Sequence, residues 1–418
     1  MSTNAWKRAA AAVVPVAIAA TATLVADSGP ADAGTKKRAG QQSTQLISES
    51  FRGGVPNGPS SHGVISNDRR WARLIAFQSD ASDIVRGDTN GQTDVFAVRR
   101  ARPTNNRGTK WRQGPSVLVS RGRNGLANGP SFAPAVSGGF HTRPPKCVGF
   151  LSAATNIARS DTNGRVDPFL VRSLGRVPKR LNLPGGKQAQ QDTTQIAVSG
   201  DCKRIAFVTG GKLYVNFKGR TKRLRTRANV SDPSFSTGLK NHLVFAARGG
   251  IYLSQLGLRR PKRIARGGTD PAFNDVKRRV LAYEVRRGGR TQIAYKDLGR
   301  KPRIISKRHS HVGNGDSRNP VIGNSGYYVT FESEANNLWV DAARRVRDHN
   351  GNPDSYLFTD VRELTLVQSV EEKGVPVPGG GSNPSMSFYA NYILFDSPAP
   401  LGRRQGPHQV FMRWLGPV

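Results

Sequence analysis

Two neighbouring stretches decide the fold: PSFSTGLKNHLVFAARGGIYLSQL at residues 233–256 and PAFNDVKRRVLAYEVRRGGRTQIAYKDL at residues 271–298. Each opens with a short strand that begins with proline and ends in a small or polar residue. A second, apolar strand follows and ends in an aromatic residue, and a third strand is rich in β-branched and aromatic residues. The two stretches are therefore copies of one antiparallel unit, and a unit of this kind predicts further copies along the chain.

The aromatic residue that ends the second strand marks seven copies along the chain. The markers are Phe77, Phe150, Phe207, Phe245, Tyr283, Phe331 and Phe395. A fourth strand follows each of the first six copies, whereas the remaining fourth strand, TQLISES at residues 44–50, precedes the first copy. Because blades bury their faces only against neighbours, the pattern predicts an all-β, seven-bladed β-propeller in which the N-terminal strand completes the C-terminal blade.

The compact copies at 233–245 and 271–283 resemble the TolB-like, WD-repeat-like propeller family. The longer copies FQSDASDIVRGDTNGQTDVFAV (77–98) and FLSAATNIARSDTNGRVDPFLV (150–171) are similar to an exported bacterial branch of it. The resemblance covers nearly the whole mature chain. It implies the propeller fold, and some TolB-like propellers resemble lyases of acidic oligosaccharides.

The N-terminus has the features of a secretory signal peptide over residues 1–33. Lys7 and Arg8 precede an apolar stretch at 9–26, and small residues at 31–33 form a cleavage site. A retained membrane anchor is the alternative, but an alanine-rich stretch that contains Pro15 inserts weakly. We expect residues 34–43 to be a flexible lead-in and 44–418 to be the propeller. The mature protein should be secreted or extracytoplasmic, without a stable membrane span.

Cys147 and Cys202 lie at equivalent positions of adjacent repeats, at or just before the second strand. Exported proteins meet oxidising conditions, and an even number of cysteines favours pairing. We therefore predict a Cys147–Cys202 disulfide. Two buried free thiols are the alternative.

A polar motif, DxNGxxD, occurs in three of the loops between second and third strands. The acids and amides that the three loops share are Asp88, Asn90 and Asp94; Asp161, Asn163 and Asp167; and Asp348, Asn350 and Asp354. Alternating carboxylates and amides around a glycine are typical of calcium loops. Asn-Gly is also the commonest hairpin turn, in which Asp caps nearby amides. We predict turns and no cofactor, with calcium as the alternative.

A second set of polar residues stands where the innermost strands begin, which in a propeller is the mouth of the central channel. The set comprises Asn57, Asn128, Asp232, Asp270, Asn319 and Asn383. We interpret Asp232, Asp270, Asn319 and Asn383 as candidate ligand-binding residues, the alternative being that they only initiate turns before proline. His309 and His311 are the only close histidine pair, and a solvated loop explains them better than a metal site.

The formal net charge is +36 at pH 7, and many of the cations fall in loops that share one face of the disc. Such a face attracts polyanions, although charge also keeps proteins soluble. We therefore expect an exported, non-enzymatic propeller that binds an anionic envelope component or a protein partner, with nucleic acid bound only as a non-specific polyanion. The sequence contains no recognisable catalytic motif, so no catalytic residues are assigned. The alternative is a carbohydrate-active enzyme, a lyase or hydrolase of acidic saccharides, with its site at the channel mouth.

Overall fold

The computed structural model describes residues 42–416 apart from 69–70, 102–108, 139–144, 146, 227, 239, 241, 256–259, 277, 324–325, 339–347, 349, 361–363, 370–376 and 399–405. The expected signal peptide lies outside these residues, as does the lead-in except for residues 42 and 43.

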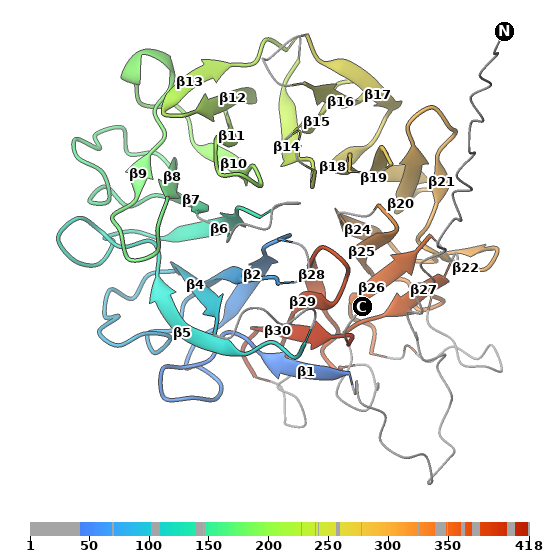
Figure 1. Cartoon of the computed structure of the whole chain (residues 1–418), viewed down its shortest axis with the longest axis horizontal. Coiled ribbons are helices and arrows are strands. Elements are labelled where there is room, and N and C mark those ends of the chain that lie inside the picture. The colour runs from blue at the N-terminus through green and yellow to red at the C-terminus, as the bar shows by residue number, and fades with distance from the viewer. Residues whose placement is uncertain are drawn as a thin grey trace, which may run out of the picture.

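Seven four-stranded antiparallel sheets surround one axis, so the predicted all-β propeller is confirmed (Figure 1). Blades 1 to 3 consist of β2 (Ser60–Ile65), β3 (Leu74–Ser79), β4 (Asp94–Arg100) and β5 (Gln113–Leu118); β6 (Ser131–Val136), β7 (Val148–Ser152), β8 (Asp167–Val171) and β9 (Lys179–Arg180); and β10 (Thr193–Val198), β11 (Arg204–Thr209), β12 (Lys212–Phe217) and β13 (Arg220–Arg223). A 3-10 turn, η1 (Pro184–Gly186), follows β9.

The remaining blades continue the same order from the inner to the outer strand. Blades 4 to 6 consist of β14 (Val230–Phe235), β15 (Leu243–Ala247), β16 (Gly250–Ser254) and β17 (Lys262–Arg266); β18 (Thr269–Asn274), β19 (Val280–Arg287), β20 (Arg290–Asp297) and β21 (Arg303–Ile304); and β24 (Ser317–Ile322), β25 (Tyr328–Ser333), β26 (Asp354–Thr359) and β27 (Leu364–Val367). A small hairpin of β22 (Lys307–Arg308) and β23 (His311–Val312) joins blades 5 and 6.

Blade 7 combines the two ends of the chain. It contains β28 (Ser382–Met386), β29 (Tyr392–Ser397), β30 (Gln409–Trp414) and β1 (Ser43–Leu46). The register pairs Ser43 with Trp414 and Leu46 with Phe411, so the N-terminal strand closes the ring as predicted. The hydrogen-bonded strand is shorter than the expected 44–50, although Ser48 Oγ still donates to Gln409 Oε1 at 2.7 Å.

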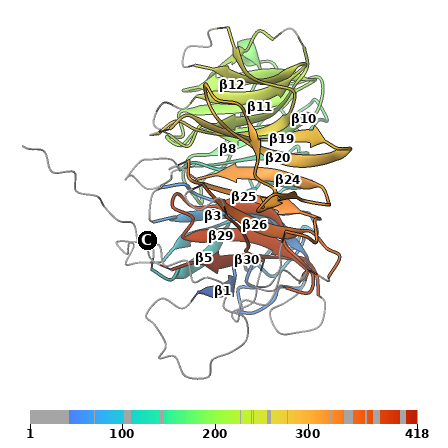
Figure 2. The same ribbon diagram turned by 90° about the vertical axis from the view of Figure 1, so that its right-hand side faces the viewer.

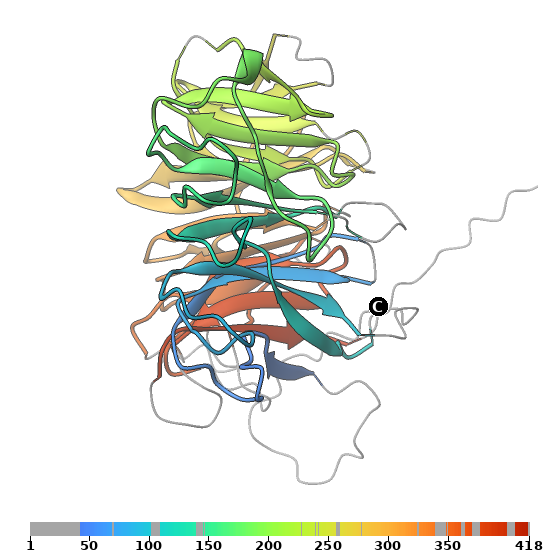
Figure 3. The same ribbon diagram turned by 90° about the vertical axis from the view of Figure 1, so that its left-hand side faces the viewer.

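The marker aromatics stack within six of the seven blades. In six blades the marker stacks on an aromatic residue opposite it on the third strand, with ring centroids 5.5–5.9 Å apart. In blade 5 the residue opposite Tyr283 is Ala294. Apart from the half-buried Tyr252, these rings are buried between sheets that lie face to face in both side views (Figures 2 and 3). Burial against both neighbours explains why the second strands are mostly apolar up to the marker aromatic.

Candidate ligand-binding sites

Six innermost strands carry a residue with positive φ at a β-bulge, and together these residues form what we call the axial ring. Its members are His62 (φ 54°), Ala133 (52°), Asp232 (53°), Asp270 (45°), Asn319 (53°) and Asn383 (48°). Asn and Asp tolerate this conformation better than other residues with a side chain. The positive φ at the bulge therefore explains why four of the six residues are Asp or Asn.

Each backbone amide of the axial ring donates a hydrogen bond to a side chain of the preceding blade. The acceptors, in blade order from His62, are Asp396 (2.6 Å), Gln78 (3.0 Å), Gln195 (2.8 Å), Asp232 (3.3 Å), Glu284 (3.0 Å) and Glu332 (2.7 Å). These bonds satisfy amides that would otherwise lack a partner in the bulge. The polar residues around the axis thus link one blade to the next.

Asp232, Asp270, Asn319 and Asn383 lie at equivalent positions of the axial ring, whereas Asn57 and Asn128 lie outside it. Asn57 lies before β2 and bonds the loop at Ser82, and Asn128 bonds the corresponding loop at Thr155. Asn-Gly-Pro in the first two repeats lies in the loop, whereas the Asp-Pro and Asn-Pro pairs of later repeats lie inside the strand. His62 and Ala133 occupy the missing places, and only strand register could have revealed them.

Carboxylates dominate this axial region although the protein is strongly basic. Burial, followed by the nearby Glu284, Asp232 and Glu332, raises the pKa of Asp270 well above its usual value. Burial also raises the pKa of Asp396 to about 7, against hydrogen bonds from His62 and Asn383. Both shifts favour the neutral acid in the folded protein.

The three DxNGxxD loops form turns in which the asparagine caps the chain. Asn90 Oδ1 accepts from the amide of Gln92 at 3.1 Å, and its Nδ2 donates to Asp94 at 2.7 Å. In the same way, Asn163 Oδ1 accepts from the amide of Arg165, and Asn350 Oδ1 accepts from the amide of Asn352. Each loop also places two carboxylates near each other: Asp88 with Asp94, Asp161 with Asp167 and Asp348 with Asp354.

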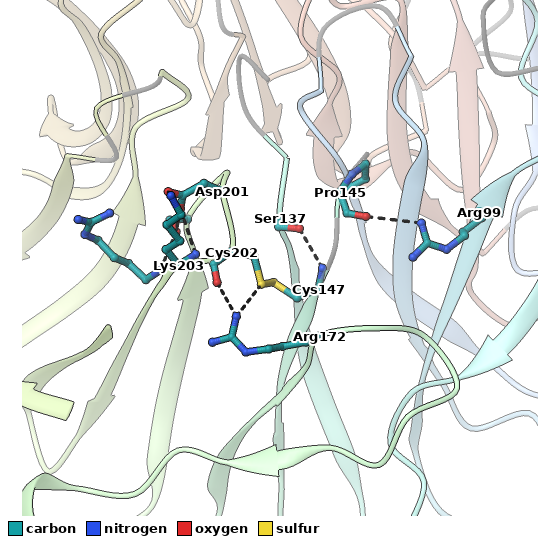
Figure 4. Close-up of a disulfide and its surroundings, with 10 residues drawn as sticks. Arg99, Ser137, Pro145, Cys147, Arg172, Asp201, Cys202 and Lys203 are labelled. Carbon is teal, nitrogen blue, oxygen red and sulfur yellow. Dashed lines mark hydrogen bonds and ion pairs between the residues drawn. A yellow bond between two sulfur atoms is a disulfide. The ribbon is translucent and has the colours of Figure 1, made fainter. Parts of the chain in front are cut away.

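Cys147 and Cys202 form a disulfide that links blades 2 and 3, with Cα atoms 6.1 Å apart (Figure 4). Cys147 stands just before β7, and Cys202 lies in the turn between β10 and β11 at φ 59°. Arg172 Nη1 donates to the carbonyl oxygen of Cys202 at 3.0 Å. The covalent link thus fixes the start of the second strand in both of these blades.

A pocket of about 760 Å³ opens beside this disulfide, between β9 of blade 2 and the β12–β13 hairpin of blade 3. Figure 1 shows β9 and β13 at the outer edges of neighbouring blades. The cations that line this basic pocket are Arg172, Lys179, Arg180, Lys203, Lys218 and Arg220. Lys203, Lys218 and Arg220 are among the cations whose loops are expected on the basic face of the disc, but the sequence does not show that they meet the other three.

Most of these cations are available to a ligand. Arg180 is bound to two aspartates, and Lys203 lies 4.0 Å from Asp201 while its side chain is 59% exposed. Within the described ranges, no carboxylate forms an ion pair with Lys179, Lys218 or Arg220. The exposed ring of Phe217, which does not line the pocket, lies under the guanidinium of Arg204 at 4.6 Å and near the Nζ of Lys218 at 5.5 Å.

Among the described residues, no group of three or more His, Cys, Asp or Glu side chains is placed to hold a metal ion. Neither does this part of the chain contain a helix long and apolar enough to cross a bilayer. His309 and His311 belong to the β22–β23 hairpin, where His311 is exposed.

No protein-family model and no curated protein matches the sequence. A puromycin-hydrolysing peptidase from Mycobacterium tuberculosis aligns with 88% of this chain at 11% identity and a TM-score of 0.50. This chain spans about half of that peptidase, 52% of its length. A putative TolB from Agrobacterium tumefaciens aligns over 72% of this chain and 93% of its own, at 14% identity and a TM-score of 0.37. Hsv2 from Kluyveromyces lactis aligns over 60% and 67%, at 12% identity and a TM-score of 0.38.

Identities this low carry information about the fold alone. The blade count, strand order and ring closure of this chain are those of a β-propeller. By fold, the chain is a seven-bladed β-propeller, as its resemblance to TolB-like repeats implied.

Proposed function

We propose that this protein is an exported, non-enzymatic propeller that binds an anionic polymer of the cell envelope in the basic pocket between blades 2 and 3. The observation that carries the proposal is the concentration of cations in one 760 Å³ pocket where Lys179, Lys218 and Arg220 have no carboxylate partner among the described residues. Cations that neutralise no acid of their own protein are available to neutralise the acids of a ligand.

The walls of the pocket suit repeated anionic groups. Lys179 and Arg220 are exposed on different blades, so a chain that crosses the pocket would meet charges from both. The uncharged side chains of Asn182, Asn216 and Thr221 also line it and can bond hydroxyl groups. A phosphorylated or acidic saccharide polymer offers both kinds of group.

Export is supported by the leader-like residues 1–33 and by the disulfide, since disulfides persist in oxidising compartments. A protein partner and nucleic acid remain competitors for the same charges. A carbohydrate-active enzyme would differ from a binding protein in one observable respect, because it would shorten the saccharide that it binds.

The test is binding of the mature protein to heparin, teichoic-type phosphopolymer and duplex DNA over a series of salt concentrations. We expect the logarithm of the affinity to fall linearly with the logarithm of salt, because each neutralised anion releases a condensed counterion. Lys179→Glu, Lys203→Glu and Arg220→Glu together should reduce affinity at least tenfold and flatten the slope.

The matched control reverses the same amount of charge elsewhere, with Arg248→Glu, Arg287→Glu and Arg290→Glu, all exposed near turns between second and third strands. This variant should lose much less affinity. Equal losses in both variants would mean that net charge acts in bulk, and salt-insensitive binding of the wild type would refute the proposal.

A further inference from the structure

Blades 3, 4 and 5 have short turns where blades 1, 2 and 6 have the long DxNGxxD loops. The turns between their second and third strands consist of residues 210–211, 248–249 and 288–289. The glycines in these two-residue turns have φ between 56° and 88°, the backbone conformation that tight hairpins require. This part of the disc face therefore consists of strand ends instead of acidic loops.

Each of these short hairpins carries arginine or lysine, and so does the connection from blade 4 to blade 5. The exposed cations at these four places, which we call the turn cations, are Lys212, Arg248, Arg266, Arg286, Arg287 and Arg290. The four turns with their flanking residues, 209–212, 247–250, 266–269 and 287–290, contain no acid. The cations therefore outnumber the acids locally.

The turn cations share one face of the disc. In an antiparallel four-stranded blade, the turn between second and third strands and the connection to the next blade lie at the same ends of the strands. The β12–β13 hairpin, which lines the basic pocket, joins a third to a fourth strand and so lies at the opposite ends. The turn cations and the basic pocket are thus separate surfaces.

The hairpin of blade 5 extends farther than its neighbours. The paired part of the second strand continues two residues past the marker aromatic in blades 3 and 4, to Thr209 and Ala247, but four residues in blade 5, to Arg287. Two further residues per strand add about 7 Å. Figures 2 and 3 show the β19–β20 hairpin projecting past the neighbouring strands on one side of the disc. Its tip is the part of this surface that a partner meets first.

The charges of the turn cations are available to a partner. In the part of the chain that the structure describes, none of them forms an ion pair with a carboxylate. Glu284 instead accepts from the amide of Asn319 at 3.0 Å, and Asp316 pairs with Arg318 at 2.6 Å. Arg286 Nη2 donates to a carbonyl oxygen of its own turn at 2.6 Å, which leaves its charge without an opposite charge.

We propose that the turn cations form a docking surface for an anionic phospholipid bilayer. Five of the six are arginines, whose planar guanidinium groups bind the oxygens of a phosphate two at a time. They stand on three consecutive blades, so a broad partner can meet them together. Lipid headgroups diffuse laterally and adjust to cations that are irregularly spaced, and an anionic bilayer attracts such clusters. This docking does not depend on polymer binding in the basic pocket.

The experiment measures how the mature protein partitions onto sedimented vesicles of phosphatidylcholine, with and without phosphatidylglycerol. We expect it to bind the vesicles that contain phosphatidylglycerol and to be released as salt screens the charges. Arg248→Glu, Arg287→Glu and Arg290→Glu together should lower the partition coefficient about tenfold or more.

The matched control reverses the same amount of charge in the basic pocket, with Lys179→Glu, Lys203→Glu and Arg220→Glu. It should keep most of the vesicle binding while it loses the polymer binding proposed above, so the two surfaces are tested separately. Equal loss of vesicle binding in both variants, or equal binding of the wild type to both kinds of vesicle, would overturn the proposal.

A second variant keeps the proposal testable if the first fails to fold. Lys212→Glu with Arg266→Glu changes exposed side chains of two other turns and should also lower the partition coefficient, by a smaller factor. Undiminished vesicle binding in both turn variants would refute the docking surface. Heparin affinity of the turn variants should change little, and a loss as large as that for vesicles would mean a general polyanion surface instead of a lipid surface.

Discussion

The basic pocket and the axial ring are both polar, yet they use their charges in opposite ways. Around the axis, the acids accept hydrogen bonds from strained backbone amides, as Asp396 does from His62 and Glu332 does from Asn383. At the outer edge, Lys179 and Arg220 face a cavity with no acid paired to them among the described residues. The difference indicates that axial polar groups hold the ring together, whereas the pocket's charges are free to bind.

This contrast reverses the expectation from propeller architecture, in which ligands are sought at the central channel. A polar residue at the axis is weak evidence of a ligand site when its side-chain oxygen already accepts a hydrogen bond from the protein. A cation without an acid partner is stronger evidence, since the fold gains little from exposed charge.

The largest effect should come from removing the closing strand. A chain that begins at residue 51 lacks β1 and leaves the edge of β30 unpaired, so its melting temperature should fall by about 10 °C or more. A chain that begins at residue 42 keeps β1 and should melt like the mature protein. If both truncations melted alike, the ring would not depend on its closure.

The disulfide should rank second. Cys147→Ser with Cys202→Ser removes a link across 55 residues and should lower the free energy of unfolding by about 4 kcal/mol in urea titrations. Mass spectrometry of the exported wild type should show the two cysteines joined. Alkylation of both thiols without a reductant would disprove the link.

An axial acid should matter for stability and leave polyanion binding unchanged. Asp396→Ala leaves the amide of His62 and the side-chain amide of Asn383 without acceptors, which should cost about 3 kcal/mol. Gln78→Ala removes the acceptor of one amide only, that of Ala133, and should cost about 1 kcal/mol. A large loss of heparin affinity in either variant would break the contrast between ring and pocket.

Asp396 should also make the stability of the protein depend on pH. Its folded-state pKa of about 7 exceeds the unfolded value of 3.8, so the folded protein holds the proton more tightly. Stability relative to Asp396→Asn should therefore be greatest at low pH. It should fall by up to about 1.4 kcal/mol per pH unit as the pH rises toward 7, then level off. A difference that grew with pH would mean that the carboxylate form is the stabilising one.

The smallest effect on stability should come from a single pocket lysine. Lys179→Ala should change the free energy of unfolding by less than about 0.5 kcal/mol. It should weaken polyanion binding and reduce the log-log salt slope by about 1. An unchanged slope would remove Lys179 from the binding surface.

Nearly all of the fold could be predicted from the sequence, because each blade repeats one apolar strand that is marked by an aromatic residue. The closing strand was recognisable since six copies have a fourth strand and TQLISES supplies the seventh. The sites were harder to predict. Arg180 meets Asp161 and Asp167 only through the register of β8 and β9, and no spacing rule connects them. The pocket likewise depends on two blades whose cations are far apart in the chain.

The pairing of β1 with β30 also constrains how the protein acquires its structure. Trp414 lies about 370 residues after its partner Ser43 in the chain, so the ring cannot close until all of the chain between them has been synthesised. At about 5–20 residues per second this takes tens of seconds or more. During that time the terminal blades expose unpaired edges and apolar faces, which is a risk of aggregation. A chain of this design benefits from remaining unfolded, or from protection by a chaperone, until β30 has been synthesised.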